Sequence, residues 1–131
     1  MKATLCFLVV LAMISCTTAP KEPQHIRRFG QVIKVKPEKL EYYKELHAHP
    51  WPCVLEKIRE ANIRNYTIFQ QDTLLFAYFE YIGTDFDADM KKIAADTCTQ
   101  RWWRETDPCQ ESLSPNGQSW WLNMVEVFHS E

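Results

Sequence analysis

The sequence predicts a single α+β domain in which a four-stranded antiparallel sheet carries its helices on one face. Three observations support this fold class. Segments of alternating apolar residues stand near both ends of the chain, two β-branched and aromatic runs joined by a short polar turn lie in the middle, and helically spaced segments separate them. The expected order is therefore β-α-β-β-α-β.

Composition agrees with a small globular domain. Of 131 residues, 46% are apolar, 24% are charged and three are glycine, which excludes disordered, collagen-like and low-complexity chains. A net charge of −2 without a basic stripe makes nucleic acid an unexpected partner. Aromatic residues reach 13%, more than a core of this size needs, so we expect some rings to form a binding surface.

The N-terminus is expected to direct export. Lys2 and the apolar run of residues 3–14 have the layout of a secretory signal, and the run is shorter than the ~20 residues of a membrane-spanning helix. The segment Leu11-Ala12-Met13-Ile14-Ser15-Cys16 resembles a bacterial lipoprotein lipobox, in which the cysteine is acylated. Plain secretion after cleavage near Ala19 is the alternative.

We therefore divide the chain into three parts. Residues 1–16 are a lipoprotein-type signal peptide ending at the lipidated Cys16, residues 17–27 are a tether, and residues 28–131 are the folded domain. The expected location is the bacterial periplasm or the outer membrane, with the lipid anchor as the only membrane contact. Cys53, Cys98 and Cys109 remain in the domain; lacking C-x-x-C spacing, they are interpreted as free thiols, with a Cys98–Cys109 bridge left open.

The first half of the domain predicts a strand and two helices. Apolar residues alternate over residues 29–35, Pro37 opens a helix, and helical spacing follows from Leu40. Pro50 must end that helix, and Pro52 is suited to the first turn of the next.

The second half predicts a hairpin, further helix and a last strand. Residues 63–69 and 74–81 form the hairpin, Gly83 ends it, and residues 85–104 are helical with a possible break near Asp96. A loop over residues 107–117 precedes a strand over residues 122–129. This order is that of ferredoxin-like domains, whose second sheet face needs cover, so we expect a homodimer.

Two segments that are far apart in the sequence carry candidate chemistry. Tyr43 and His47 stand four residues apart on one helix face, so a phenol and an imidazole could address one ligand, or both could be interior residues packed with Leu40. The pair His47 and His49 would diverge on a helix, so no metal site is expected.

Trp102 and Trp103 form the second candidate. Neighbouring indoles on a helix lie ~100° apart and cannot both enter one core, so at least one should face a cavity. Indole rings suit a sugar, a heme or another aromatic ligand, or a dimer interface. Trp120 and Trp121 could act likewise, or could simply begin the last strand.

These residues also match a known family in order. The motifs are Val35-Lys36-Pro37, Tyr43-x-x-x-His47, Trp51-Pro52, Asn65-Tyr66-Thr67-Ile68, Leu74-Leu75-Phe76-Ala77, Gln100-Arg101-Trp102-Trp103 and Glu126-Val127-Phe128. Together they resemble the L-rhamnose mutarotase family. The resemblance implies a dimeric ferredoxin-like fold, His47 as the general acid, and a sugar bound by Tyr43, Tyr66, Trp102 and Trp103.

The expected activity is that of an aldose 1-epimerase, an isomerase that interconverts the α and β anomers of L-rhamnose or a related 6-deoxy sugar. The expected partner is a small monosaccharide, and no cofactor or metal is expected to take part. A sugar-binding lipoprotein without catalysis is the first alternative, and a heme-handling ferredoxin-like dimer is the second.

Overall fold

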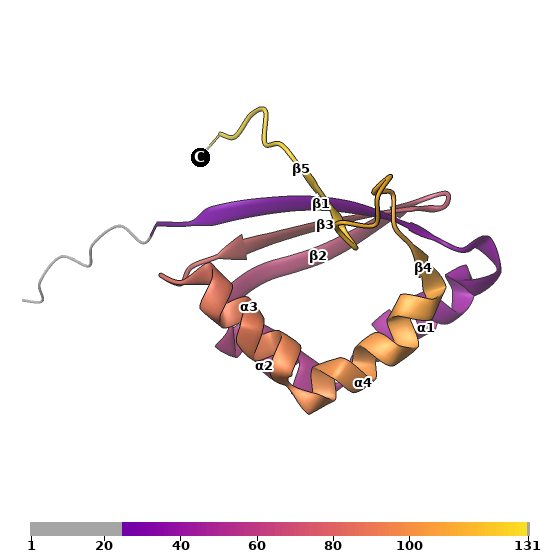
Figure 1. Ribbon diagram of the computed structural model, residues 1–131, viewed down its shortest axis with the longest axis horizontal. Helices are drawn as coiled ribbons and strands as arrows, with labels where there is room; N and C mark the ends of the chain where they lie inside the picture. The colour runs from indigo at the N-terminus through magenta and orange to yellow at the C-terminus, as the bar shows by residue number, and fades with distance from the viewer. Residues whose placement is uncertain (1–24, 131) are drawn as a thin grey trace, which may run out of the picture.

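The computed structural model describes residues 25–130, which form one antiparallel sheet with four α-helices against one face (Figure 1). The elements are β1 (Arg27–Val35), η1 (Pro37–Lys39), α1 (Leu40–Ala48), α2 (Pro52–Glu60), β2 (Ile63–Gln71), β3 (Leu74–Tyr81), α3 (Phe86–Ala95), α4 (Thr97–Thr106), η2 (Asp107–Cys109), β4 (Gln110–Glu111) and β5 (Leu122–Met124). The predicted α+β class is confirmed.

The sheet is built around β1. Its strand order is β2-β3-β1-β4, every described pair is antiparallel, and β5 pairs with the same edge of β1 as β4. The two short strands share that edge because β4 lies against Lys34 and Val35 while β5 lies against residues 30–32. The predicted hairpin is present as β2 and β3.

Prolines and aspartates set the helix boundaries. Pro52 occupies the first turn of α2, as expected of a residue that cannot donate a backbone hydrogen bond. Asp85 caps α3 by accepting from the Ala88 amide, and Asp96 both ends α3 and caps α4 by accepting from the Thr99 amide at 2.8 Å. The break near Asp96 is therefore confirmed, and its cause is a new N-cap.

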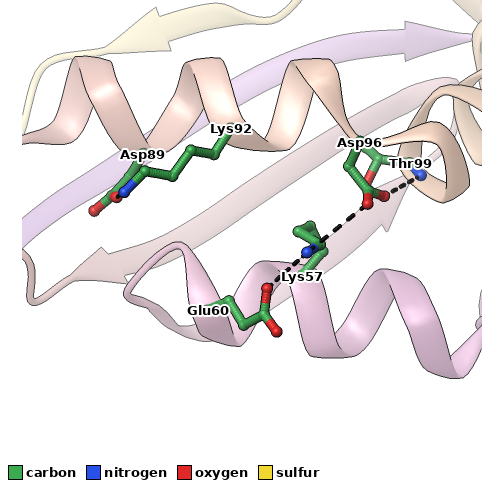
Figure 2. Close-up of polar contacts among 6 residues, drawn as sticks. All are labelled: Lys57, Glu60, Asp89, Lys92, Asp96 and Thr99. Atoms are coloured by element: carbon green, nitrogen blue, oxygen red, sulfur yellow. Dashed lines mark hydrogen bonds and ion pairs between the residues drawn. The ribbon is translucent and has the colours of Figure 1, made fainter.

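Ion pairs form within and between the helices of the layer that covers the sheet. The Lys57 ammonium on α2 donates to Glu60 at 2.6 Å and lies 3.8 Å from the Asp96 carboxylate, so one lysine connects α2 to the junction of α3 and α4 (Figure 2). On α3, Lys92 donates to Asp89 at 2.8 Å. Of these pairs, Lys57–Asp96 links two helical segments, whereas the other two each lie within one helix.

The core lies between the sheet and α1. The alternation of β1 and β3 turns Ile33, Val35 and Leu75 toward the helices, where each is almost fully buried. A second cluster, centred on Val54, Cys98 and Trp102, joins α2 to α4. The helices are thus held by their own packing as well as by the sheet.

The C-terminal strand is shorter than predicted. Its β-structure ends at Met124, and residues 125–130 have no regular structure and extend away from the helices (Figure 1). Val127 is 93% exposed, and although the Arg28 side chain of β1 lies 2.6 Å from His129 Nε2, no backbone pairing with β1 is found for this stretch. The alternating pattern predicted a strand over residues 122–129, but its pairing with β1 stops at Met124.

The expected loop over residues 107–117 is also partly wrong. Its first five residues form η2 and β4, and the Lys36 amide donates to the Cys109 carbonyl at 2.8 Å. Local turn residues marked the segment as irregular, whereas contact with the edge of β1 draws its beginning into the sheet.

The interpretation of the domain cysteines as free thiols is wrong for two of them. Cys53 on α2 and Cys98 on α4 form a disulfide, with their Cα atoms 6.4 Å apart. Cys109 is free and buried, and its thiol donates to the Glu105 carbonyl at 3.4 Å. The Cys98–Cys109 bridge left open from the sequence is thereby excluded. Sequence spacing carries no sign of this pairing, because it depends on how α2 packs against α4.

The signal peptide, the lipidation site Cys16 and most of the tether lie outside the described residues. Arg27, the last residue assigned to the tether, is the first residue of β1. Within residues 25–130, no helix is both long and apolar enough to cross a bilayer.

Candidate functional site

A cavity of about 600 Å³ lies between the sheet and the helices. Its walls come from α1, β1, β2, β3, α2, α3 and α4, and are completed by β4 and by the segment before β5. Most of the lining is aromatic or aliphatic, and none of its lining residues is Lys or Arg. Such a cavity suits an uncharged ligand with both apolar and hydrogen-bonding surface.

Tyr43 provides a protonated hydroxyl on this cavity. It lies on α1, it is 3% exposed, and its Oη accepts a hydrogen bond from Gln110 Nε2 at 3.3 Å. Burial raises the pKa of the Tyr43 phenol well above its ordinary value of 10. Tyr43 therefore keeps its proton at any physiological pH and can donate it to a ligand.

Tyr66 approaches the cavity from β2, where the strand is irregular. The pairing with β3 shifts register between Arg64 and Thr67, and Asn65 has a positive φ of 52°. This bulge sets the direction of the Tyr66 ring, which meets the Phe79 ring edge to face at 5.6 Å. Although 42% of the residue is exposed, burial around its hydroxyl raises the pKa to about 12.

Both members of the tryptophan pair line the cavity. Trp102 is 7% exposed, and its ring lies edge-on to Trp51 at 5.4 Å, whereas Trp103 is 38% exposed. Their positions differ because neighbouring residues on α4 point in different directions. One indole is thus held firmly by the core, and the other borders solvent.

His47 lies behind this wall and is not among the cavity-lining residues. Its ring is 4.1 Å from that of Tyr43 and 5.3 Å from that of Trp102, centroid to centroid. His47 Nδ1 lies 2.9 Å from the Tyr43 carbonyl oxygen, which can only accept, so Nδ1 is assigned the proton and Nε2 carries the lone pair of the neutral ring. Burial lowers the pKa of His47 below its ordinary 6.5.

Three further residues complete the cavity. Trp120 and Trp121, which the sequence left open between a ligand wall and a strand start, both line it, and Gln110, which sequence reasoning missed, lies between Tyr43 and Trp120. No local signal could have identified Gln110, because it belongs to a segment that reads as loop.

The two histidines near the end of α1 do not form a metal site. His49 pairs with Glu45 at 3.2 Å on the exposed side of the helix, away from His47. Among residues 25–130, no group of three or more His, Cys, Asp or Glu side chains is arranged to hold a metal ion.

The arrangement combines flat aromatic surfaces with neutral hydrogen-bonding groups. Indole rings pack against the C–H faces of a sugar while hydroxyl and amide groups bind its hydroxyls. Asp107 is the one acidic side chain on the lining, and burial raises its carboxyl pKa. The cavity can therefore hold a neutral carbohydrate close to the phenol of Tyr43.

Comparison with known proteins agrees with this chemistry. The family described as L-rhamnose mutarotase matches residues 28–130. A curated L-rhamnose mutarotase of Listeria monocytogenes serotype 4b is 31% identical over 107 residues, covering 79% of this chain and 98% of the relative. That of Oceanobacillus iheyensis is 27% identical over 108 residues, covering 81% and 100%.

Solved structures show the same fold. A crystal structure of an L-rhamnose mutarotase from Formosa agariphila aligns with a TM-score of 0.63 at 21% identity, covering 80% of this chain and 99% of that one. The tetracenomycin F2 cyclase of Streptomyces glaucescens, a polyketide cyclase, aligns with a TM-score of 0.58 at 15% identity, covering 80% and 96%. Chains with different functions thus share this architecture.

Proposed function

This chain belongs to the L-rhamnose mutarotase family, and from that premise we propose which sugar it takes and how its residues act. It is a carbohydrate isomerase of the epimerase type. Its proposed substrate is L-rhamnose or a related 6-deoxy sugar, whose α and β anomers it interconverts. The observation that carries this proposal is the cavity, because its aromatic walls and neutral polar groups suit an uncharged sugar.

The reaction requires two proton transfers. A proton is delivered to the ring oxygen and another is removed from the anomeric hydroxyl, so that the C1–O5 bond breaks and the aldehyde forms. Rotation about C1–C2 followed by the reverse transfers closes the ring on the other face. All atoms are conserved, and positioned acid–base groups contribute typically 10²–10⁴-fold to such a rate.

Each proposed site residue has a role in this scheme. His47 is the proposed general acid, Tyr43 binds a sugar hydroxyl or assists the proton transfer, and Tyr66 donates from the sheet. The Trp102 and Trp103 rings form the stacking wall. Because the His47 ring stands behind Tyr43 and Trp102, it must turn toward the cavity or act through the Tyr43 hydroxyl.

The test follows the interconversion of rhamnose anomers by saturation-transfer NMR. We expect wild type to accelerate the exchange above buffer, His47→Ala to lose about 10²-fold or more, and His49→Ala to retain it, since His49 lies on the exposed side of the same helix. No acceleration by wild type with rhamnose, fucose or another 6-deoxy sugar would refute the proposed substrate class. Tight sugar binding that survives His47→Ala would instead favour a sugar-binding protein without catalysis.

The pH dependence of the enzymatic rate tests whether the charged or the neutral form of His47 acts. Burial lowers its pKa below the ordinary 6.5, so near pH 7.5 the ring is mostly neutral, and the imidazolium fraction increases as the pH falls. If the imidazolium is the acid, the enzymatic rate above buffer rises between pH 7.5 and 5.5. The same rise in His47→Ala would show that another group supplies the proton.

We also propose that the protein is a homodimer joined through the uncovered face of the sheet. Cross-strand pairing aligns an apolar row across this face, which we call the open-face row: Phe69, Phe76, Val32 and Leu122. Phe69 is 62% exposed. A row of this kind favours burial against a second copy. Light scattering on purified domain should give twice the mass of one chain, and a monomer at micromolar concentration would contradict the proposal.

Finally, we propose that the protein is an exported lipoprotein of the periplasm or outer membrane. The lipobox-like segment ending at Cys16 supports this, and so does the Cys53–Cys98 disulfide, since such bonds persist in oxidising compartments. Mass spectrometry of protein from the membrane fraction should find Cys16 acylated, and Cys16→Ser should release the protein from that fraction. An unmodified Cys16, or cleavage near Ala19, would contradict lipidation.

A further inference from the structure

We propose that Gln110 is a positioning residue that holds the Tyr43 hydroxyl as a hydrogen-bond donor toward the sugar. This inference rests on the proposed function, and it assigns a role to a residue outside the motifs by which the chain resembles its family. Gln110 begins β4, where it pairs with Val35 of β1, and it is 5% exposed. Its side chain also borders the cavity.

Both ends of the Gln110 amide are occupied by side chains of the cavity wall. Its Oε1 accepts from Trp120 Nε1 at 2.9 Å, and its Nε2 donates to Tyr43 Oη at 3.3 Å. An indole N–H can only donate, so it selects the amide orientation in which oxygen faces Trp120. The NH₂ group must then face Tyr43.

This orientation decides the role of the phenol. A hydroxyl that accepts from Gln110 does not use its own proton in that bond, so the proton remains for another acceptor. Tyr43 lines the cavity, and its hydroxyl stays protonated because burial raises its pKa. Sugar hydroxyl and ring oxygens are acceptors of this kind. The Trp120 indole therefore acts through Gln110, ten positions away, on Tyr43, which is 67 positions from Gln110.

The decisive variant is Gln110→Glu, which keeps the shape of the side chain and an oxygen facing Trp120. When ionised, the introduced carboxylate can only accept, so the Tyr43 hydroxyl must donate to it and is lost to the sugar. We expect the dissociation constant for L-rhamnose to rise about 5- to 30-fold at neutral pH. When the carboxyl is protonated at lower pH it can donate to Tyr43, and affinity should recover. A merely structural role would not produce this pH-dependent rescue.

Three further variants keep the test sharp. Gln70→Glu adds the same charge on the exposed part of β2 and should leave affinity unchanged at every pH. Gln110→Met is neutral, so it gives a pH-independent loss even if the buried carboxylate of Gln110→Glu prevents folding. In a Tyr43→Phe background, Gln110→Glu should add little further loss, because its effect passes through the missing hydroxyl.

A second readout does not depend on sugar. With ¹³Cζ-labelled tyrosine, and the Tyr43 signal assigned by its absence in Tyr43→Phe, this signal in Gln110→Glu should follow the titration of the introduced carboxyl. A Tyr43 signal that ignores the titration overturns the inference whatever the activity. A signal that follows it while rhamnose affinity stays at the wild-type value overturns the sugar-directed role. Wild type that neither binds nor isomerises rhamnose overturns the proposed function, and with it this role of Gln110.

Discussion

The two faces of the sheet differ in whether helices of the same chain cover them. On the covered face, Ile33, Val35 and Leu75 are almost fully buried under α1, and the cavity occupies the rest of the interface with the helices. On the other face, the open-face row crosses four strands, and Figure 1 shows no helix on that side of the sheet. The same alternation of side chains produces both faces, but helices cover only one of them, and the other also carries the charged residues Arg28, Lys34 and Glu80.

This difference predicts that substitutions on the two faces have different effects, one on the folding of a single chain and the other on association between chains. The covered face supplies the core, the disulfide and every proposed sugar-binding residue, so changes there should alter the stability or the chemistry of one chain. Changes on the open face should alter contacts between chains and leave the unfolding of one chain nearly unchanged.

The largest expected effect is that of Trp102→Ala. Trp102 is buried between α2 and α4, and removing a buried indole costs about 3–5 kcal/mol in the free energy of unfolding. Phe69→Ala, on the open face, should change it by about 0.5 kcal/mol or less at concentrations where the chain is monomeric. Urea unfolding of both variants measures this contrast. Equal losses would show that the open face belongs to the core of a single chain.

The disulfide should have the next largest effect. Replacing both Cys53 and Cys98 by Ser should lower the free energy of unfolding by about 2–4 kcal/mol, because the closed loop spans 45 positions and restricts the unfolded chain. Dithiothreitol should lower the melting temperature of wild type and leave that of the double variant unchanged. Insensitivity of wild type to reductant would mean that the bond does not form in solution.

A charge on the open face should act mainly on association. We expect Phe69→Glu to weaken the proposed dimer at least about 10-fold, since the carboxylate would have to be buried without a partner, and to change monomer unfolding little. Sedimentation measures the first effect and denaturation the second. Gln70→Glu, which places the charge on the other face of the same strand, serves as the control. A dimer unaffected by Phe69→Glu would place the interface elsewhere.

The smallest expected effect concerns acid stability on the helix layer. The Asp89 carboxylate accepts from Lys92, Asn62 and Tyr81, which lowers its pKa from 3.8 to about 2. Because the folded pKa is depressed, the stabilisation is present above the unfolded value near 3.8 and is lost as the pH falls toward 2.

In Asp89→Asn, the free energy of unfolding should therefore decrease less between pH 4 and pH 2 than it does in wild type. Thermal unfolding over that range measures the slope, and Asp87→Asn on the same helix is the matched control because it leaves the Asp89 contacts in place. An unchanged slope in Asp89→Asn would show that other carboxyls dominate acid unfolding.

Local signals were sufficient where one residue decides an outcome alone. Pro52 must begin a helix because it lacks an amide donor, and Asp96 both stops one helix and caps the next. The alternation over residues 29–35 likewise predicted the strand that the structure shows as β1. These features depend on neighbours within a few positions, which the sequence shows directly.

In the candidate site, too, the sequence predicted only those features that depend on neighbouring residues. The sequence predicted that Tyr43 and Trp102 would line a binding site, and the structure places both on the cavity. These predictions used helical geometry, which relates residues that are one or four positions apart. The position of His47 behind Tyr43, and of Gln110 beside it, depends on packing between α1, α4 and β4, which no local pattern reports.

By itself, the sequence determined the fold class, the order of the helices and the hairpin, and the family, because periodicity, proline positions and ordered motifs are visible in neighbouring residues. Only the tertiary structure decided that Cys53 pairs with Cys98, that the C-terminal strand ends at Met124, and that Gln110 joins Tyr43 to Trp120. Each of these outcomes depends on which distant segments approach within bonding distance, and that is a property of the packed chain.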